Sequence, residues 1–211
     1  MALELYNIQT ITYREAMDCV IKNHYLHRQA PCSKAFGLFH CGELKGVVVY
    51  GVSCSSTLLK GICGVEESKN VYELTRLWVS DDVPKNGESF LIGNTLKLLD
   101  KEIIVSFSEI QQGHLGVVYQ ATNFYYCGLS AKFTDPKVKG LEHQHHATYA
   151  HGMNMEEVRS KYGVDNVYYV ERPRKHRYII FNAKKNRKKE LLSKLKYPIL
   201  PYPKNEIDLF N

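Results

Sequence analysis

The segment VYELTRLWVSDDVPKNGESFLIG, residues 71–93, constrains the fold more than any other part of the chain. Residues 71–79 have the alternation of a strand, and residues 80–84 are typical of a turn. After Gly87 apolar side chains recur at helical spacing, so a helix should follow the loop directly. The N–H groups at such a helix start can bind phosphate, with Lys85 adding charge. Since strand–loop–helix units also arise for structural reasons alone, the residues leave phosphate binding open.

Elsewhere the chain predicts helices and strands that alternate around one sheet. This order predicts an α/β fold, a single domain with a central mixed β-sheet flanked by helices and a basic C-terminal helix. The expected helices cover about residues 13–23, 88–102, 155–162 and 184–196, and the expected strands cover 35–41, 46–54, 71–79, 103–109 and 177–181.

The stretch LGVVYQATNFYYCGL, residues 115–129, is rich in aromatic rings and amides. Residues 116–119 fit a strand, whereas Ala121, Phe124 and Tyr125 recur at helical spacing. The residues alone are equally compatible with rings that fill a core and rings that face a substrate.

Charge is distributed unevenly along the chain. Residues 1–171 hold 16 Lys and Arg against 19 Asp and Glu, whereas residues 172–211 hold 12 against 3. A strongly basic C-terminal fifth suggests a polyanionic partner such as nucleic acid, the alternative being a solvated basic tail. The candidate phosphate contacts are Arg172, Arg174, Lys175, Arg177, Lys184, Lys185, Arg187, Lys188 and Lys189.

Three further patterns bear on compartment and metal content. The six cysteines form no C-x-x-C pair, which favours reduced thiols over a zinc site or a disulfide framework. The N-terminus has neither a basic start nor an apolar run, and no stretch approaches the roughly 20 apolar residues of a membrane span, so a cytoplasmic protein is expected. No metal is assigned, although a metal stays open because His143, His145, His146 and His151 lie near one another in the sequence, without tetrahedral spacing.

Two sets of motifs carry a resemblance to known families. The unit of residues 71–93, followed by a strand and the pattern A-x-x-F-Y-x-x-G, resembles the GNAT acetyltransferase superfamily. More closely, ELTRLWVSDDVPKNGES, SFSE…GHLGVVYQATNFYYCG and HRYIIF resemble the Mom family of bacteriophage DNA-modification proteins, over about residues 20–182. The second GNAT motif is carried by Ala121, Phe124, Tyr125, Gly128 and Leu129.

This resemblance implies a GNAT-like catalytic domain over residues 1–182, followed by a basic helix and tail over residues 183–211. It implies an acetyl-CoA-type donor and modification of the exocyclic N6 amine of adenine in double-stranded DNA. The adduct would be of carbamoylmethyl type and would protect phage DNA from restriction in the host cytoplasm. The loop departs from the GNAT pattern Gln/Arg-x-x-Gly-x-Gly/Ala, because Pro84-x-x-Gly87-x-Ser89 replaces it, which leaves a different activated donor open.

Arg76 and Tyr125 are the first candidate catalytic residues. Arg76 lies in an otherwise apolar strand, where an unpaired charge is costly, so it should meet a partner or an anion unless its sheet face is exposed. Glu73 alternates to the opposite face and is not expected to pair with it. The resemblance implies that the Tyr125 phenol protonates the departing thiolate, while packing in a core is the alternative.

The remaining candidates would contact the base or the donor. Tyr119 could stack on a flipped base, and Gln120 or Asn123 could hydrogen-bond adenine unless these amides cap a helix. The serines of strand 103–109, Ser106 and Ser108, could line the floor of the site. His24, Tyr25 and His27 could close over the substrate. The resemblance places the donor against Leu77, Trp78, Val79, Lys85, Asn86, Gly87, Glu88 and Ser89.

Two other functions fit the same residues. One is a GNAT enzyme that acylates an amine of a protein, an RNA or a small molecule. The other is a non-catalytic DNA-binding module, whose binding would be salt-sensitive.

Overall fold

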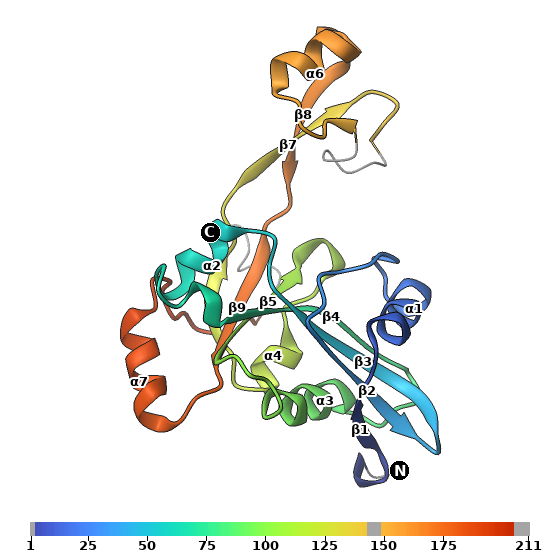
Figure 1. The fold of residues 1–211 in the computed structure, drawn as a ribbon, viewed down its shortest axis with the longest axis vertical. Coiled ribbons are helices and arrows are strands. Elements are labelled where there is room, and N and C mark those ends of the chain that lie inside the picture. Colours follow the sequence, from blue (N-terminus) through green and yellow to red (C-terminus); the bar gives the residue numbers. More distant parts are fainter. Residues whose placement is uncertain (1–2, 143–148, 205–211) are drawn as a thin grey trace.

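Within residues 3–142 and 149–204, which the computed structural model describes, a seven-stranded sheet forms the centre of the molecule (Figure 1). Neighbouring strands are antiparallel except β4 and β5, which are parallel, so the predicted α/β fold with a mixed central sheet is confirmed. The strands, in sheet order, are β1 (Asn7–Thr10), β2 (Lys34–His40), β3 (Glu43–Gly51), β4 (Val71–Val79), β5 (Ile103–Glu109), β9 (Lys175–Phe181) and β6 (Tyr125–Leu129).

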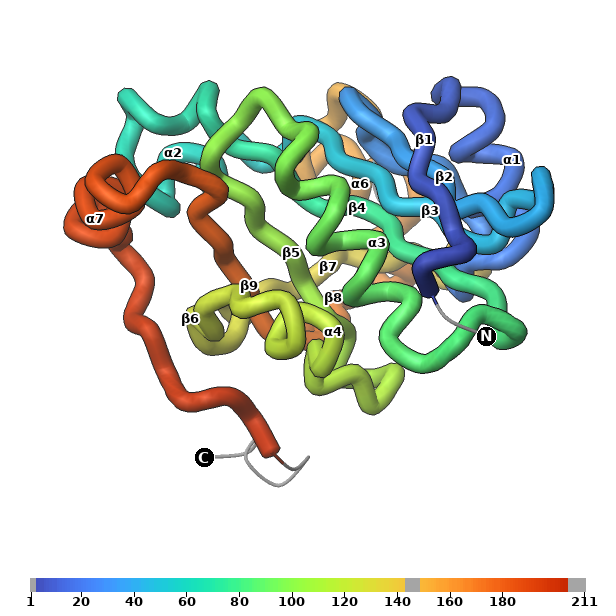
Figure 2. The backbone as a smooth tube through the Cα atoms, turned by 90° about the horizontal axis from the view of Figure 1, so that it is seen from below, coloured from blue at the N-terminus to red at the C-terminus, as the bar shows by residue number. Residues whose placement is uncertain are grey.

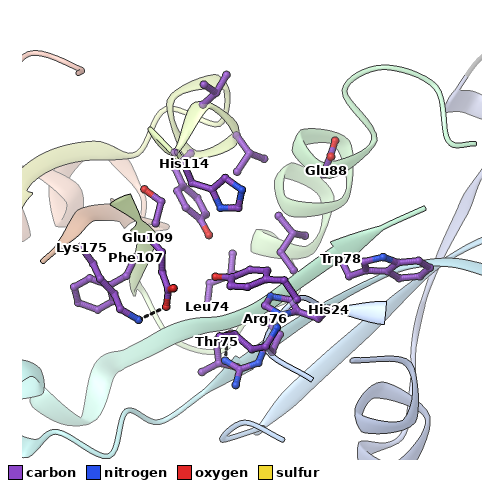
Figure 3. Close-up of a pocket in the computed structure, with 18 of the residues that line it drawn as sticks. His24, Leu74, Thr75, Arg76, Trp78, Glu88, Phe107, Glu109, His114 and Lys175 are labelled. Carbon is purple, nitrogen blue, oxygen red and sulfur yellow. Dashed lines mark hydrogen bonds and ion pairs between the residues drawn. The ribbon is translucent and has the colours of Figure 1, made fainter. Parts of the chain in front are cut away.

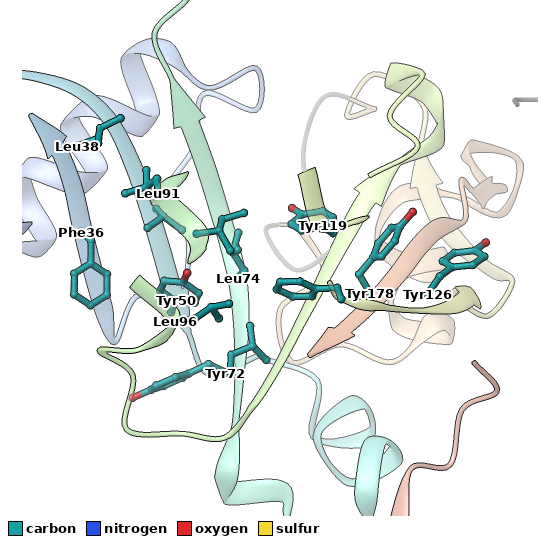
Figure 4. Close-up of a cluster of buried hydrophobic side chains, with 14 of the residues drawn as sticks. Phe36, Leu38, Tyr50, Tyr72, Leu74, Leu91, Leu96, Tyr119, Tyr126 and Tyr178 are labelled. Atoms are coloured by element: carbon teal, nitrogen blue, oxygen red, sulfur yellow. The ribbon is translucent and has the colours of Figure 1, made fainter. Parts of the chain in front are cut away.

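Helices cover both faces of this sheet (Figure 2). On one face, α3 and α4 pack against a large core rich in tyrosine (Figure 4). On the other face, α1 covers β2 and β3, whereas α2 and α7 cover β5, β9 and β6. The bounds are α1 (Tyr13–Asn23), α2 (Ser56–Cys63), α3 (Gly87–Leu96), α4 (Val117–Ala121) and α7 (Lys185–Lys194). Among the described residues no helix is both long and apolar enough to cross a bilayer.

Short-range chemistry explains several of these boundaries. The Thr12 side chain accepts from the Glu15 N–H while the Glu15 carboxylate accepts from the Thr12 N–H, a capping box that starts α1 where the sequence predicts it. Between β2 and β3, Cys41 and Gly42 both have positive φ, 50° and 83°, as a tight hairpin turn requires.

The parallel pairing of β4 with β5 is short. It joins only four residue pairs, from Val71 with Ile103 to Leu74 with Ser106. At Thr75 the pairing of β4 with β3 shifts by one residue, a β-bulge on β4. Beyond this point β4 pairs with β3 alone, and the two parallel strands diverge.

A two-stranded ribbon projects from this body (Figure 1). It consists of β7 (Phe133–Val138) and β8 (Val167–Arg172), with α6 (Met155–Tyr162) at its far end. We call residues 133–142 and 149–172 the arm. The arm has a small core of its own, in which Val158 is fully buried.

The prediction for residues 115–129 is wrong in both halves. The left half, expected as a strand, forms α4, and the right half, expected as a helix, forms strand β6. Helix α4 lies between two residues in the left-handed region, Gly116 at φ 71° and Asn123 at φ 62°. A side chain at position 116 would place its Cβ 2.4 Å from the Tyr178 ring, so glycine is needed there. Beyond Asn123, pairing with β9 outweighs the helical spacing of the rings.

Four further elements were not expected from the sequence. They are β1, α2, β7 and β8. The strands of the arm are mostly exposed, and β7 contains Pro136, so they lack the apolar alternation that reveals a half-buried strand.

The C-terminal segment is packed against the body as far as it is described. Leu191 of α7 is fully buried, and Arg187 bridges Glu67 at 2.6 Å and Glu102 at 2.9 Å. Farther on, the Leu200 N–H donates to the Tyr126 carbonyl, which extends the sheet edge.

We predict that Leu191→Ala lowers the free energy of unfolding by about 2–5 kcal/mol, because it leaves a cavity between α7 and the sheet. The matched control is Leu98→Ala, whose side chain is 58% exposed and whose effect should stay within about 0.5 kcal/mol. Urea denaturation measures both. Equal, small effects would show that α7 unfolds independently of the body.

Candidate active site

A cavity of about 500 Å³ opens where β4 and β5 diverge (Figure 3). Its walls come from the segment after α1, from residues 73–79 of β4 and from residues 107–119. Glu88 of α3 and Lys175 of β9 lie at its two ends (Figure 3). The divergence of the strands therefore creates a space for ligands inside an otherwise continuous sheet.

Arg76 lies beside the β-bulge and is held by backbone carbonyls. Its Nη1 donates to the Thr75 carbonyl at 2.6 Å and its Nη2 to the Gln29 carbonyl at 3.1 Å. Its Nε–H is buried and has no partner among the described residues. Burial lowers the pKa of Arg76, and Arg28 lowers it further. Arg76 thus offers a fixed cation with one unused donor.

The expectation that Glu73 lies on the opposite face from Arg76 is wrong, although the two side chains form no ion pair within the described residues. Both residues line the cavity, and the Glu73 carboxylate raises the pKa of Arg76. The cause is the bulge, because its extra residue interrupts the two-residue alternation of β4.

His24 and Tyr25 form one wall of the cavity. The His24 ring is buried and stacks on Tyr25 at 4.3 Å between centroids. Its Nδ1 accepts the Leu26 N–H at 3.1 Å, so the ring hydrogen of the neutral form is on Nε2. Burial, followed by Arg76, lowers the pKa of His24 to about 4. The neutral ring is therefore a hydrogen-bond donor toward the cavity at physiological pH.

Tyr119 lies at the inner end of the cavity, between the Phe124 and Tyr178 rings. Burial raises its pKa to about 12, although a hydrogen bond with Ser106 acts in the opposite direction. The Ser106 hydroxyl itself donates to the Leu74 carbonyl at 3.3 Å. The Tyr119 phenol is thus a proton donor connected to β4 through Ser106.

Ser108 adds a second hydroxyl to the cavity wall. Its Oγ is buried and has no hydrogen-bond partner among the described residues. A buried hydroxyl without a partner is unusual, and a ligand in the cavity would supply one.

Three other predicted contacts lie outside the cavity. Gln120 donates to the Leu115 carbonyl at 3.1 Å and to the Tyr178 hydroxyl at 3.4 Å, so it holds the turn before α4. Asn123 is exposed beside α3, and Tyr125 packs near Phe181 on the face covered by α2 and α7. Arg76 and Tyr119 line the cavity, whereas Ser106 is buried, hydrogen-bonds Tyr119 and does not itself line it. Asn123 and Tyr125 lie apart from these residues.

The residues that were predicted to bind the acyl donor lie at or beside one end of the cavity. Leu77, Trp78, Val79 and Glu88 line it. Lys85, Asn86, Gly87 and Ser89 form the loop and the first turn of α3.

The start of α3 suits phosphate only in part. Asn86 occupies the N-cap position in the left-handed region and its side chain makes no capping hydrogen bond. The Gly87 N–H already donates to the Pro84 carbonyl at 3.1 Å, so only the next N–H groups of the first turn could meet a ligand. Gly87 is needed for packing, since a Cβ there would lie 2.5 Å from Val83. The Glu88 carboxylate at the same end disfavours an anion.

The structure contradicts one of the predicted DNA contacts. Arg177 is 8% exposed, and its guanidinium stacks on Tyr197 at 3.9 Å, so it cannot reach a phosphate. Arg187 is bound to three carboxylates, those of Glu67, Glu102 and Glu190. Among the other candidates, Lys184, Lys185 and Lys189 are exposed on α7, Lys188 lies over Tyr125, and Arg172, Arg174 and Lys175 lie at the base of the arm.

Of the predicted histidine cluster, His143, His145 and His146 lie outside the described residues. Across residues 3–142 and 149–204 no group of three or more His, Cys, Asp and Glu side chains is arranged to hold a metal. His27 does not line the cavity, although it closely follows His24.

Sequence reasoning did not place Glu109, His114 and Lys175 at the cavity, although Lys175 was predicted as a phosphate contact. The Lys175 Nζ lies 2.6 Å from Glu109, and His114 meets the Tyr25 ring edge-on at 5.8 Å. Glu109 and His114 lie in the motif SFSE…GHLG, but their proximity to Lys175 could not be predicted from local sequence, because β5 and β9 become neighbours only in the folded sheet.

A model of the family described as the Mom protein family matches residues 5–204. The chain belongs to the Mom family. The curated protein "Methylcarbamoylase mom" of Escherichia phage Mu is 30% identical to this Mom family member over 197 residues, which cover 87% of this chain and 74% of the phage Mu protein. The predicted resemblance is therefore confirmed.

Solved structures similar to this Mom family member include acetyltransferases. A Bacillus subtilis acetyltransferase in complex with CoA is 15% identical, with a TM-score of 0.46 over 83% of this chain and 98% of that chain. A GNAT family acetyltransferase from Bacillus cereus is 10% identical, with a TM-score of 0.45 over 85% and 99%. Similarity of this degree is weak, and the family assignment rests on sequence.

We predict that His24 makes the folded protein sensitive to acid. Its pKa is near 4 when folded, below the ordinary value of 6.5, so the unfolded chain binds the proton first as the pH falls. The free energy of unfolding should therefore fall by about 1–2 kcal/mol between pH 7 and pH 5 because of His24 alone. His24→Asn keeps an acceptor for the Leu26 N–H but does not titrate. Its free energy of unfolding should therefore fall less than that of the wild type between pH 7 and pH 5. Urea denaturation at both pH values measures the difference, and equal losses would contradict the assignment.

Proposed function

We propose that this Mom family protein modifies the exocyclic N6 amine of adenine in double-stranded DNA: N6 attacks the carbonyl of an activated acyl donor, an N6–acyl bond forms and the leaving group of the donor departs. The carbamoylmethyl-type adduct that the family resemblance implies is joined to N6 through a methylene carbon, so it would need an oxidant and a source of amide nitrogen in addition. The donor is acetyl-CoA or a related activated acyl compound, and the modification protects phage DNA from restriction in the host cytoplasm. The observation that carries the proposal is the cavity between β4 and β5, where Arg76, neutral His24 and protonated Tyr119 surround a space of about 500 Å³. Family membership supports a transferase that modifies DNA.

The donor enters from the end of the cavity formed by Trp78, Val79 and the start of α3. Past the bulge, residues 75–79 of β4 do not pair with β5, so a donor with amide groups can hydrogen-bond there like an added strand. Lys85 and the uncapped first turn of α3 would hold its phosphates. Bound in this way, an acyl-CoA supplies an activated thioester.

Adenine reaches the cavity only after it leaves the base stack. Tyr25, 44% exposed and stacked on His24, offers a ring face to the extruded base. The N6 amine is a weak nucleophile and needs an acceptor for a proton. Glu109 is paired with Lys175, whereas Glu73 makes no ion pair within residues 3–142 and 149–204, so Glu73 is the acceptor that we assign.

The oxygen of the reacting carbonyl and the leaving group both need hydrogen-bond donors from the protein. The Arg76 Nε–H and the Ser108 hydroxyl are unused, buried donors that can stabilise charge developing on an oxygen. Tyr119, with a pKa of about 12, stays protonated at neutral pH and can donate a hydrogen bond to a departing thiolate, which is a weaker base than the phenolate and leaves the proton on Tyr119. We therefore place Tyr119, rather than Tyr125, beside the leaving group, where the resemblance had implied Tyr125.

We predict that Arg76→Ala and Tyr119→Phe each reduce DNA modification by about 10²-fold or more, because each removes a donor from the cavity. Tyr125→Phe is the matched control and should retain modification, since Tyr125 packs on the other face of the sheet. Mass spectrometry of nucleosides from the DNA of cells that express each variant gives the measurement.

The outcomes separate the alternatives. A nucleoside of unchanged mass with the wild type would contradict DNA modification, and binding of donor without a DNA adduct would indicate acylation of another amine. An acetyl adduct is the product expected of direct acyl transfer and would overturn only the carbamoylmethyl adduct that the resemblance implies. Loss of modification in Tyr125→Phe but not in Tyr119→Phe would return the proton-donor role to Tyr125.

A further inference from the structure

A second hollow, of about 510 Å³, lies between the cavity and the base of the arm. Leu26, Glu109 and Lys175 line both spaces, so the two are adjacent. We call this second space the cationic hollow, because five basic side chains line it. They are Arg28, Lys137, Arg172, Arg174 and Lys175.

Positive charge exceeds negative charge in the cationic hollow. Two carboxylates also line it, and each already has a cation: Asp135 is 2.5 Å from Arg172, and Glu109 is 2.6 Å from Lys175. Arg28 is exposed and makes no ion pair within the described chain. Arg174 donates its Nε–H to the Ser130 carbonyl at 2.7 Å, which orients it and leaves its charge without a carboxylate.

The position of the cationic hollow favours DNA phosphates over those of the donor. The start of α3, where the donor loop lies, adjoins Glu88, whereas the cationic hollow adjoins Lys175 at the other end of the cavity (Figure 3). A donor and a nucleotide that enter from opposite ends would meet beside Arg76.

The arm gives a duplex room at this end. Its ribbon continues away from the body (Figure 1), and four successive residues of β8, from Tyr169 to Arg172, are exposed. Phe133, Tyr169 and Val170 are 59%, 49% and 43% exposed. A two-stranded ribbon of this kind fits the major groove of B-DNA, and exposed rings can contact bases or sugars there.

We propose that the cationic hollow binds the DNA phosphates that flank the target nucleotide, so that the extruded adenine enters the cavity from the side of the arm. This inference rests on the proposed function for its substrate. Phosphate contacts position the duplex and carry no sequence information, so the hollow sets where the base enters rather than which sequence is chosen.

The test measures binding of a 20-base-pair duplex by fluorescence anisotropy across a series of salt concentrations. Arg28→Ala should weaken binding about three- to fivefold and lower the slope of log affinity against log salt by about 0.9, the value for one phosphate contact. Arg28→Ala with Arg174→Ala should lower the slope by about 1.8. Arg28→Lys keeps the positive charge, so its salt slope should stay close to that of the wild type.

The matched control is Arg14→Ala, which removes an exposed arginine at the start of α1, outside the cationic hollow, and should leave the slope unchanged. The proposal would be overturned if the Arg28 and Arg174 variants bound the duplex with the same affinity and the same salt slope as the wild type. Loss of CoA binding in these variants with DNA binding intact would also overturn it, because the hollow would then hold donor phosphates.

Failure of the proposed function gives a different result. If the wild type leaves nucleoside masses unchanged while the Arg28 variants lose their DNA-binding slope, the proposed reaction fails and the phosphate site stands. If the wild type modifies DNA and the variants bind and modify it equally well, the phosphate site fails and the reaction stands.

Discussion

Pairing between β4 and β5 ends at Leu74 and Ser106, and the groups at the cavity owe their positions to that ending. The bulge at Thr75 turns β4 toward β3, which leaves the other edge of its last residues to a ligand. It also brings Glu73 and Arg76 to one cavity, although an unbroken strand would separate them. Helix α4 and the segment before it then close the space from the side of β5. An uninterrupted parallel pair would bury these groups inside a sheet.

Burial widens the pH range over which His24 and Tyr119 keep their neutral forms. Desolvation keeps the His24 ring neutral and the Tyr119 phenol protonated at neutral pH, so both present hydrogen-bond donors. Arg76 keeps its charge because backbone carbonyls, rather than a carboxylate, satisfy its guanidinium. The cavity therefore combines one fixed cation with neutral donors, while the exposed charges collect at the base of the arm.

Local patterns in the sequence predicted much of the fold. The helix that begins at residue 13, the strand–loop–helix unit of residues 71–93 and the final strand all follow from short-range chemistry, and the structure confirms them. The prediction for residues 115–129 was wrong for two reasons. Gly116 and Asn123 take left-handed backbone conformations, which the spacing of side chains does not reveal. In addition, the segment pairs with β9, which lies about 50 residues away in the sequence. Arg76 could be chosen from its apolar surroundings, whereas Lys175 and Glu109 meet only through the tertiary pairing of β9 with β5. The choice between Tyr119 and Tyr125 likewise depends on which face of the sheet each ring occupies.

A crystal structure of the protein with bound CoA tests most directly whether the cavity between β4 and β5 is the reaction site. The account predicts that the CoA sulfur lies in this cavity, within hydrogen-bonding reach of Tyr119 or Ser108, and that its amide groups pair with residues 75–79 of β4. CoA bound beside Asn123 in the hollow near α3, or in the cationic hollow, with the cavity filled by water, would contradict it.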